Sequence, residues 1–260
     1  MLIKIPRIWL LCKCSGIYYF KFKKGYIGEM KKPKSSQRKS PDALPDGMLS
    51  LDLLQQKILA NEFEIGQHIR ENVLATEFGV NRNAIRNALN QLVAWRVFEY
   101  VPFCGYRVRN FQVKDIIECC ELRLAIEPPA ARRLAILRPD KALARLRELI
   151  TLEHEAILNK ARAMAGRYDH EFHYEIVVNC GNNTFAWLQN SIRLIMPFLD
   201  QLAVPRMAME NPDPDGSKTI GAHNRILQCI KEGDAENAEN EARIHCSRML
   251  RQITAVAITM

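Results

Sequence analysis

Residues Ile69 to Leu92 read IRENVLATEFGVNRNAIRNALNQL, and this stretch decides the fold. The first part is a short helical segment that ends at Gly79, because glycine tolerates the positive φ that a helix C-terminus often requires. A longer helix follows Asn81, whose side chain is a good N-terminal cap. The stretch therefore predicts a helix, a tight turn and a second helix. We expect the inward-facing residues of the first helix to be Val73, Leu74 and Phe78.

The second helix has two faces of opposite character. Its apolar residues recur at the three, four, seven and eight spacing of one buried stripe. They are Ala84, Ile85, Ala88, Leu89, Leu92 and Val93. The opposite face carries Arg82, Asn83, Arg86, Asn87 and Asn90. Two arginines four residues apart, flanked by amides that donate and accept, suit contacts to phosphates and base edges in a major groove.

Two short β-prone runs follow this helix, at residues 97–101 and 106–109, on either side of Pro-Phe-Cys-Gly. They predict a β-hairpin. A solvated polar face on any small helical domain would account for the second helix alone. The turn, the cap, the arginine pair and the hairpin in this order favour a winged helix-turn-helix, so nucleic acid is the first partner to consider.

Residues Leu53 to Val108 resemble the DNA-binding domain of the GntR family of bacterial transcription regulators. The resemblance implies that Arg70, Arg82 and Arg86 contact DNA, and that Gly105 lets the wing tip approach a groove. The matching residues are Gly66, Ile69, Glu71, Leu74, Ala75, Gly79, Val80, Arg82, Ile85, Arg86, Ala88, Leu89 and Gly105. Five positions depart from the family pattern and leave the operator sequence open: Ile65, Asn81, Ala84, Asn87 and Arg96.

The net charge of +8 belongs mostly to the beginning of the chain. Residues 1–40 hold eleven Lys or Arg and one acid, whereas the other 220 residues hold 26 and 28. We therefore expect a basic, disordered extension over residues 1–47. The apolar run at residues 8–12 is too short to span a bilayer. Because Met30 begins a polar basic arm, we expect residues 1–29 to precede the biological start.

The eight cysteines show no paired framework, which favours a reduced, cytoplasmic protein. From Val113 onward the sequence is helical almost throughout, and we expect an all-α bundle of six or seven helices. The fold class is thus mainly α, with a winged helix-turn-helix of three helices and a hairpin at residues 48–110 and the bundle at 111–260. The expected helix breaks are Arg138-Pro139, Gly166, Gly181-Asn182, Pro205, residues 211–216 and Gly233.

Four polar side chains of the bundle converge. Asp169 and His173 are four residues apart, so on a helix both leave the same face about one turn apart. His223 lies ten residues before Gly233 and His245 twelve after it. At about 1.5 Å rise per residue, an antiparallel hairpin brings these two histidines level. Each histidine alone is more often a surface or core residue, but three of them with one carboxylate suit Zn²⁺, and also Ni²⁺, Mn²⁺ or Fe²⁺.

The bundle resembles the FadR-type C-terminal effector domain, called FCD, over Val113 to about Ala255. Its length of about 145 residues is closer to the VanR-like branch. The resemblance implies that Asp169, His173, His223 and His245 bind a divalent metal, and that small carboxylate effectors bind against it. The matching residues are Asp115, Glu121, Arg123, Glu127, Asp169, Phe172, His173, Gly181, Asn182, His223, Gly233, Asp234 and His245.

Arg123 is a candidate clamp for the carboxylate of an effector, because a guanidinium binds a carboxylate bidentately. The alternative is an intrahelical pair with Glu127 four residues later. Arg193 is a second candidate from a later helix. Neither alternative for Arg123 is excluded by the sequence.

Together these patterns predict a homodimeric, metabolite-responsive transcription regulator, acting as a repressor on a palindromic operator. A regulator that senses the metal itself stays open as an alternative. A metal-dependent enzyme using the Asp/His/His/His centre is disfavoured, because no general base, nucleophile motif or cofactor loop accompanies the ligands. We expect the protein not to be an enzyme.

Overall fold

The computed structural model describes residues 12–14, 17–19, 46–207 and 216–258. The chain divides into two compact units, Met1–Ala43 and Leu44–Met260. The described part of the first unit contains β1 (Cys12–Cys14) and β2 (Ile17–Tyr19), which pair antiparallel. The expectation of a disordered extension did not include this pair. The expected start at Met30 lies outside the described residues.

The second unit begins with a winged helix-turn-helix, as predicted. It comprises α1 (Asp46–Leu59), β3 (His68–Ile69), α2 (Glu71–Phe78), α3 (Arg82–Ala94), β4 (Phe98–Val101) and β5 (Gly105–Val108). The strands form an antiparallel sheet in the order β3-β5-β4, with Ile69 opposite Tyr106 and Tyr100 opposite the same residue. The third strand, β3, was not predicted. It ties the chain before α2 to the wing.

Local interactions explain the turn between α2 and α3. Gly79 adopts a φ of 66° and its N–H donates to the carbonyl of Ala75, which ends α2. The side chain of Asn81 accepts from the N–H of Ala84 at 2.9 Å and starts α3. The predicted apolar stripe of α3 is buried, with Val93 half-buried at its end. The prediction for Val73 is wrong: this side chain is 56% exposed, because the buried face of α2 is turned toward Leu74.

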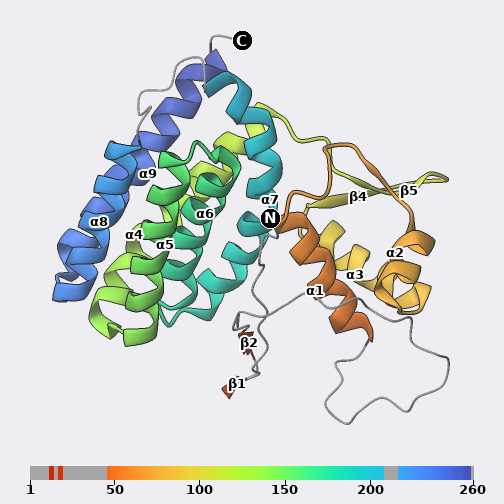
Figure 1. The fold of residues 1–260 in the computed structure, drawn as a ribbon, viewed down its shortest axis with the longest axis horizontal. Coiled ribbons are helices and arrows are strands. Elements are labelled where there is room, and N and C mark those ends of the chain that lie inside the picture. The colour runs from red at the N-terminus through yellow and green to blue at the C-terminus, as the bar shows by residue number, and fades with distance from the viewer. Residues whose placement is uncertain (1–11, 15–16, 20–45, 208–215, 259–260) are drawn as a thin grey trace. The chain divides into compact units, whose positions relative to one another are not determined.

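Six helices form the C-terminal part of the described chain (Figure 1). They are α4 (Val113–Leu137), α5 (Asp140–Leu158), α6 (Arg162–Val178), α7 (Asn183–Met207), α8 (Ser217–Glu232) and α9 (Ala235–Ile258). Within this bundle α4 packs against α9, α5 against α6, and α8 against α9. None of the described helices is long and apolar enough to cross a membrane. The predicted count of six or seven helices is confirmed.

The predicted breaks at Arg138, Gly181 and Gly233 are present, but those at Gly166 and Pro205 are wrong. Helix α6 runs through Gly166, where an added Cβ would lie 3.2 Å from a carboxylate oxygen of Asp200. The absence of a side chain at Gly166 therefore lets α6 lie close to α7 at this point. Helix α7 continues through Pro205 into its last residues. Gly233, with a φ of 79°, ends α8 and turns the chain into α9.

Candidate functional site

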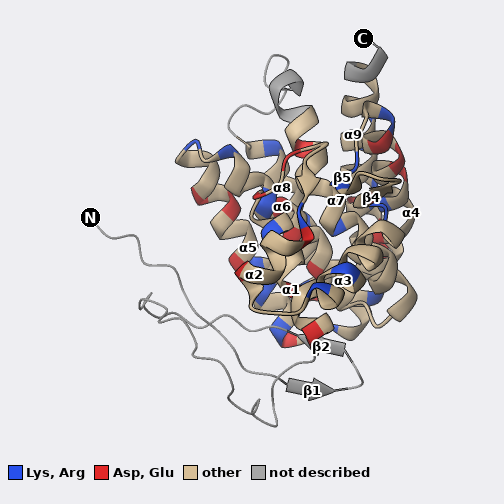
Figure 2. Ribbon diagram, turned by 90° about the vertical axis from the view of Figure 1, so that its right-hand side faces the viewer, with Lys and Arg blue, Asp and Glu red and all other residues tan. Residues whose placement is uncertain are grey.

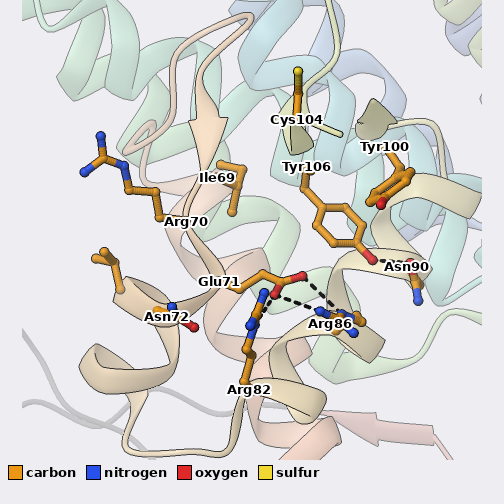
Figure 3. A pocket seen from close by; sticks show the side chains of 12 residues that line it. Ile69, Arg70, Glu71, Asn72, Arg82, Arg86, Asn90, Tyr100, Cys104 and Tyr106 are labelled. Atoms are coloured by element: carbon orange, nitrogen blue, oxygen red, sulfur yellow. Dashed lines mark hydrogen bonds and ion pairs between the residues drawn. The ribbon is translucent and has the colours of Figure 1, made fainter. Parts of the chain in front are cut away.

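The polar face of α3 is exposed, as predicted, with Arg82, Asn83, Arg86 and Asn87 all open to solvent. A cleft of about 800 Å³ lies between the start of α2, helix α3 and the wing (Figure 3). Arg70 precedes α2 at the rim of this cleft. The side chains that line this cleft therefore come from α2, from α3 and from the wing.

The wing is fixed to α3 by a pair of tyrosines. The hydroxyl of Tyr106 donates to the side-chain oxygen of Asn90 at 2.6 Å, and the ring of Tyr100 packs edge-on against Tyr106. Gly105 has a φ of 83°, a conformation that side chains rarely adopt, and it starts β5 beside the exposed tip. The position of the wing relative to α3 is therefore set by contacts within this domain.

Glu71 holds both arginines of the polar face (Figure 3). Its carboxylate binds Nε of Arg82, and it binds Nε and Nη2 of Arg86 at 3.2 Å each. Burial opposes ionisation of Glu71, but the two guanidinium groups outweigh burial and hold its pKa below the ordinary value. The sequence pointed to Glu71 only as a residue that matches the family pattern. Its ion pairs with Arg82 and Arg86 could not be predicted, because they depend on the angle between α2 and α3.

Replacement of Glu71 by glutamine is expected to strengthen binding to duplex DNA of unrelated sequence several-fold at low salt. The substitution removes a negative charge beside the arginines, so phosphates meet less repulsion. The arginines also lose a fixed orientation, and the ratio of operator to non-operator affinity should fall. Fluorescence anisotropy with both duplexes over a salt series measures these two quantities. An unchanged salt slope and an unchanged ratio would contradict this role of Glu71.

Within the bundle, the structure brings together the four predicted metal ligands. Asp169 and His173 lie on α6, His223 on α8 and His245 on α9, and one donor atom from each lies within 4.8 Å of all the others. Nε2 of His173 is 3.1 Å from Nε2 of His245. Oδ1 of Asp169 is 3.5 Å from Nε2 of His223 and 3.8 Å from Nε2 of His173. Donors about 2.0–2.1 Å from a tetrahedral zinc ion lie roughly 3.3 Å apart, so these separations fit one ion.

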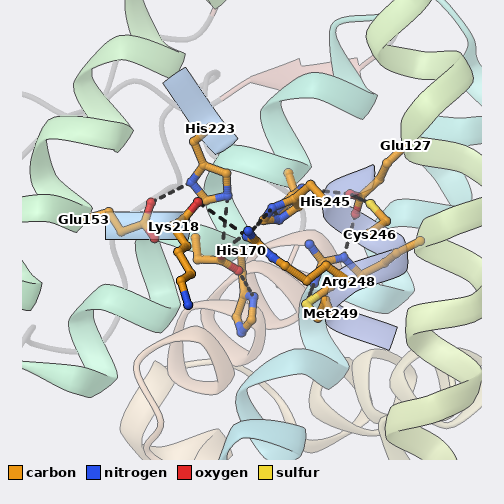
Figure 4. Close-up of polar contacts among 12 residues, drawn as sticks. Glu127, Glu153, His170, Lys218, His223, His245, Cys246, Arg248 and Met249 are labelled. Carbon is orange, nitrogen blue, oxygen red and sulfur yellow. Dashed lines mark hydrogen bonds and ion pairs between the residues drawn. The ribbon is translucent and has the colours of Figure 1, made fainter. Parts of the chain in front are cut away.

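Two buried carboxylates orient two of the histidines (Figure 4). Oε2 of Glu127 lies 2.7 Å from Nδ1 of His173, and Oε2 of Glu153 lies 2.9 Å from Nδ1 of His223. A ring nitrogen held this way leaves Nε2 for a metal. The buried Nε2 of His223 has no hydrogen-bond partner among the described residues. His245 differs, because its Nδ1 lies 3.4 Å from Nη2 of Arg248.

The electrostatics of the cluster favour metal-binding protonation states. Burial lowers the pKa of His173 and, more strongly, that of His245, so both imidazoles are kept neutral. Burial opposes ionisation of Asp169, but the close contact with the protonated His170 outweighs this and holds its pKa well below the ordinary value. Neutral imidazoles and an ionised carboxylate are the donor forms that divalent transition metals bind.

His170 lies beside the cluster, although the sequence assigned it no role. Its Nε2 is 2.8 Å from Oδ2 of Asp200, and its Nδ1 is 3.3 Å from Oδ2 of Asp169. Burial works against protonation, but the charge of Asp200, its hydrogen bond to Nε2 and the nearby Asp169 carboxylate raise the pKa of His170 to about 10. This histidine is therefore an imidazolium at neutral pH, which carries charge and does not act as a ligand.

The contribution of His170 to stability should depend on pH. Because its pKa is raised from an unfolded value of about 6.5, the stabilisation is complete below about pH 6.5 and is lost as the pH rises toward 10. We expect H170Q to be less stable than the wild type at pH 6, with the difference shrinking by up to about 1.4 kcal/mol per pH unit above that. Urea unfolding of chelator-treated proteins from pH 6 to 10 checks this. A difference that grows with pH would contradict the assignment.

Arg123 adopts the intrahelical pair that the sequence left open. Its side chain is 1% exposed, and Nε donates to Oε1 of Glu127 at 2.6 Å. Nη1 lies 3.5 Å from the sulfur of Met249, and Nη2 has no hydrogen-bond partner among the described residues. The pair with Glu127 thus occupies only one edge of the guanidinium, and a buried donor is left over.

Arg193 is engaged more completely. Its Nε and Nη2 donate to the two carboxylate oxygens of Glu171 at 2.8 and 3.0 Å, and its guanidinium lies over the ring of Tyr174. Its role toward an effector stays a prediction.

Sequence reasoning missed Glu153 and Arg248, and it did not connect Glu127 with His173. A signal for Glu153 was present, because it continues the apolar stripe of Leu146, Leu149 and Ile150. A carboxylate at a core position requires a polar partner. No comparable pattern marks Arg248.

Comparisons with known proteins identify both the DNA-binding domain and the helical bundle. The family model described as bacterial regulatory proteins, gntR family, matches residues 51–108, and that of the FCD domain matches residues 118–248. A probable D-xylose utilization operon transcriptional repressor of Paenarthrobacter nicotinovorans is 24% identical over 76% of this chain and 84% of its own length. The gluconate operon transcriptional repressor of Bacillus licheniformis is 25% identical over 70% of this chain and 74% of its own length.

Solved structures show the same fold. The chain resembles E. coli McbR/YncC with a TM-score of 0.67 and 16% identity, over 82% of this chain and 99% of that one. It resembles a putative GntR regulator from Rhodococcus sp. RHA1 with a TM-score of 0.64 and 19% identity, over 80% and 97%. With a gntR-type DNA-binding domain followed by an FCD domain, this chain belongs to the GntR family of bacterial transcriptional regulators.

Proposed function

We propose that this protein is a cytoplasmic, homodimeric repressor that binds a palindromic operator and responds to a small carboxylate bound beside a divalent metal ion. The observation that carries the proposal is the convergence of Asp169, His173, His223 and His245 inside the FCD domain. The DNA-binding domain at the other end of the chain supplies the output.

The donor set fits a divalent metal. Three imidazole nitrogens and one carboxylate oxygen suit Zn²⁺, with Ni²⁺, Mn²⁺ or Fe²⁺ as alternatives. The partnerless, buried Nε2 of His223 supports a cation at this position, because a buried polar atom rarely stays unsatisfied. When bound, the ion would act as a Lewis acid that attracts an anionic oxygen. We place Zn²⁺ first among the candidates.

Arg123 is the proposed partner of the effector carboxylate. Its Nη2 is a charged, buried donor without a partner among the described residues, and a carboxylate is the acceptor that a guanidinium binds most strongly. Arg248 is half-buried and adds a second positive charge, with Nη2 3.4 Å from Nδ1 of His245. An anion attracted to the metal would therefore meet further positive charge.

We propose a dimer because one recognition helix contacts only half of a palindromic operator, and a second copy doubles the contacts.

The response to a metabolite would come from thermodynamic linkage between effector binding and DNA binding. An effector that binds one arrangement of the bundle more tightly shifts the spacing of the two DNA-binding domains by the same free energy. In this scheme α3 with Arg82, Asn83, Arg86 and Asn87 reads the major groove, and Arg70 and the wing at Gly105 add contacts.

A thermal-shift screen of small organic acids tests the proposal. Gluconate should come first, because two relatives are gluconate operon repressors. We expect a stabilising acid to raise the melting temperature of the Zn²⁺-loaded protein and not that of chelator-treated protein, and to change operator affinity. If Zn²⁺ alone changes operator affinity and no acid does, the protein is instead a metal sensor. If no divalent ion binds, the proposed site is wrong.

A further inference from the structure

Glu153 belongs to α5, a helix that contributes no ligand to the Asp/His cluster. Its side chain is nearly inaccessible, and the carboxylate lies 2.9 Å from Nδ1 of His223. Figure 4 shows the two groups pointing toward each other from neighbouring helices. Burying a carboxylate at a core position is costly unless it is paired, so the interaction with His223 needs an explanation beyond packing.

The contact determines which nitrogen of His223 is left for the cluster. Nδ1 lies against the carboxylate of Glu153 at 2.9 Å, so Nε2 is the ring nitrogen turned toward Asp169. This Nε2 is buried, lies 3.5 Å from Oδ1 of Asp169 and has no hydrogen-bond partner among the described residues. A buried polar atom rarely stays unsatisfied, and a cation bound by both atoms would satisfy it.

The surroundings of Glu153 point to the same role. Glu127 is paired with Arg123 at 2.6 Å, whereas Glu153 contacts the His223 ring and no arginine or lysine of the described residues. Burial raises the pKa of Glu153 above its ordinary value, and the interaction with His223 opposes this. The carboxylates of Asp169 and Glu153 lie on opposite sides of the His223 ring, so the ring is held between them.

We propose that Glu153 is a positioning residue of the metal centre, which holds His223 with Nε2 toward the ion. The inference rests on the proposed metal site and adds a residue to it that does not touch the metal. Outer partners of this kind typically change metal affinity by about 10- to 100-fold.

The test compares E153L, E153Q and the control E155Q, whose glutamate is exposed on the same helix. Competition with a chromophoric chelator measures the dissociation constant for Zn²⁺. We expect E153L to weaken binding by up to about 100-fold and E153Q by about 10-fold, because leucine removes the acceptor beside Nδ1 of His223 and glutamine keeps a weaker one. E155Q should bind Zn²⁺ as the wild type does.

A purely structural role would lower the thermal stability of the apo-protein together with its affinity for Zn²⁺. E153L leaves Nδ1 of His223 without its partner and should lower the melting temperature of the apo-protein, whereas E153Q keeps an acceptor and should unfold close to the wild type, so an affinity lost in E153Q would not reflect unfolding. Imidazole ¹⁵N shifts of the Zn²⁺-loaded wild type should show His223 protonated at Nδ1. Equal affinities of wild type and E153L would overturn the role of Glu153 alone. Failure of the wild type to bind Zn²⁺ would overturn the metal site and the role of Glu153 with it.

Discussion

Replacement of His173 by alanine is expected to lower the affinity for Zn²⁺ by more than about 100-fold. Loss of an outer partner alone costs about 10- to 100-fold, and His173 is placed to bind the ion directly through Nε2, 3.1 Å from Nε2 of His245. The effector response should disappear with the metal. Operator binding by the apo-protein should stay measurable, because the DNA-binding residues lie in another domain. Metal analysis after dialysis and anisotropy titrations check both parts.

H154A is the matched control, since His154 is exposed on α5 and outside the cluster. It should keep wild-type metal content. H245A should behave as H173A does, and it tests the ligand whose Nδ1 faces Arg248 and no carboxylate. Full metal occupancy in both H173A and H245A would refute the proposed ligand set.

The parts of the fold that sequence could predict are those governed by near neighbours in the chain. The turn depends on Gly79 and Asn81, whose caps involve groups three or four residues away. The stripe of α3 was readable because thirteen residues show the helical period several times. Helix α2 has eight residues, too few to fix the direction of its buried face, and Val73 was misplaced for this reason.

The candidate site shows the same division. The convergence of the four proposed ligands was predictable, because i, i+4 spacing and a helical hairpin relate them through regular geometry. Glu153 binds a residue 70 positions away, and Glu71 binds arginines of the next helix. Such contacts depend on how helices cross, which periodicity does not specify. Gly166 was wrongly predicted as a helix break for a related reason. This glycine leaves room for the side chain of Asp200, which belongs to another helix.

The second large effect is expected in the double variant R82A/R86A, which should lose most of its affinity for the operator. Both guanidinium groups are exposed on the polar face of α3 and converge on Glu71 at the cleft beside the wing. A lost base contact typically weakens binding by roughly 5- to 150-fold, and a lost phosphate contact lowers the salt slope by about one. The double variant should therefore bind at least tenfold more weakly.

The two types of contact can be separated by comparing the single variants over a salt series. If Arg86 contacts a base edge, R86A will bind operator and unrelated duplex with more similar affinities, while a phosphate contact of Arg82 will weaken both equally in R82A. R243A is the control, because Arg243 is an exposed, ion-paired arginine of α9. Unchanged affinity and salt slope in R82A/R86A would exclude this face of α3 from the interface.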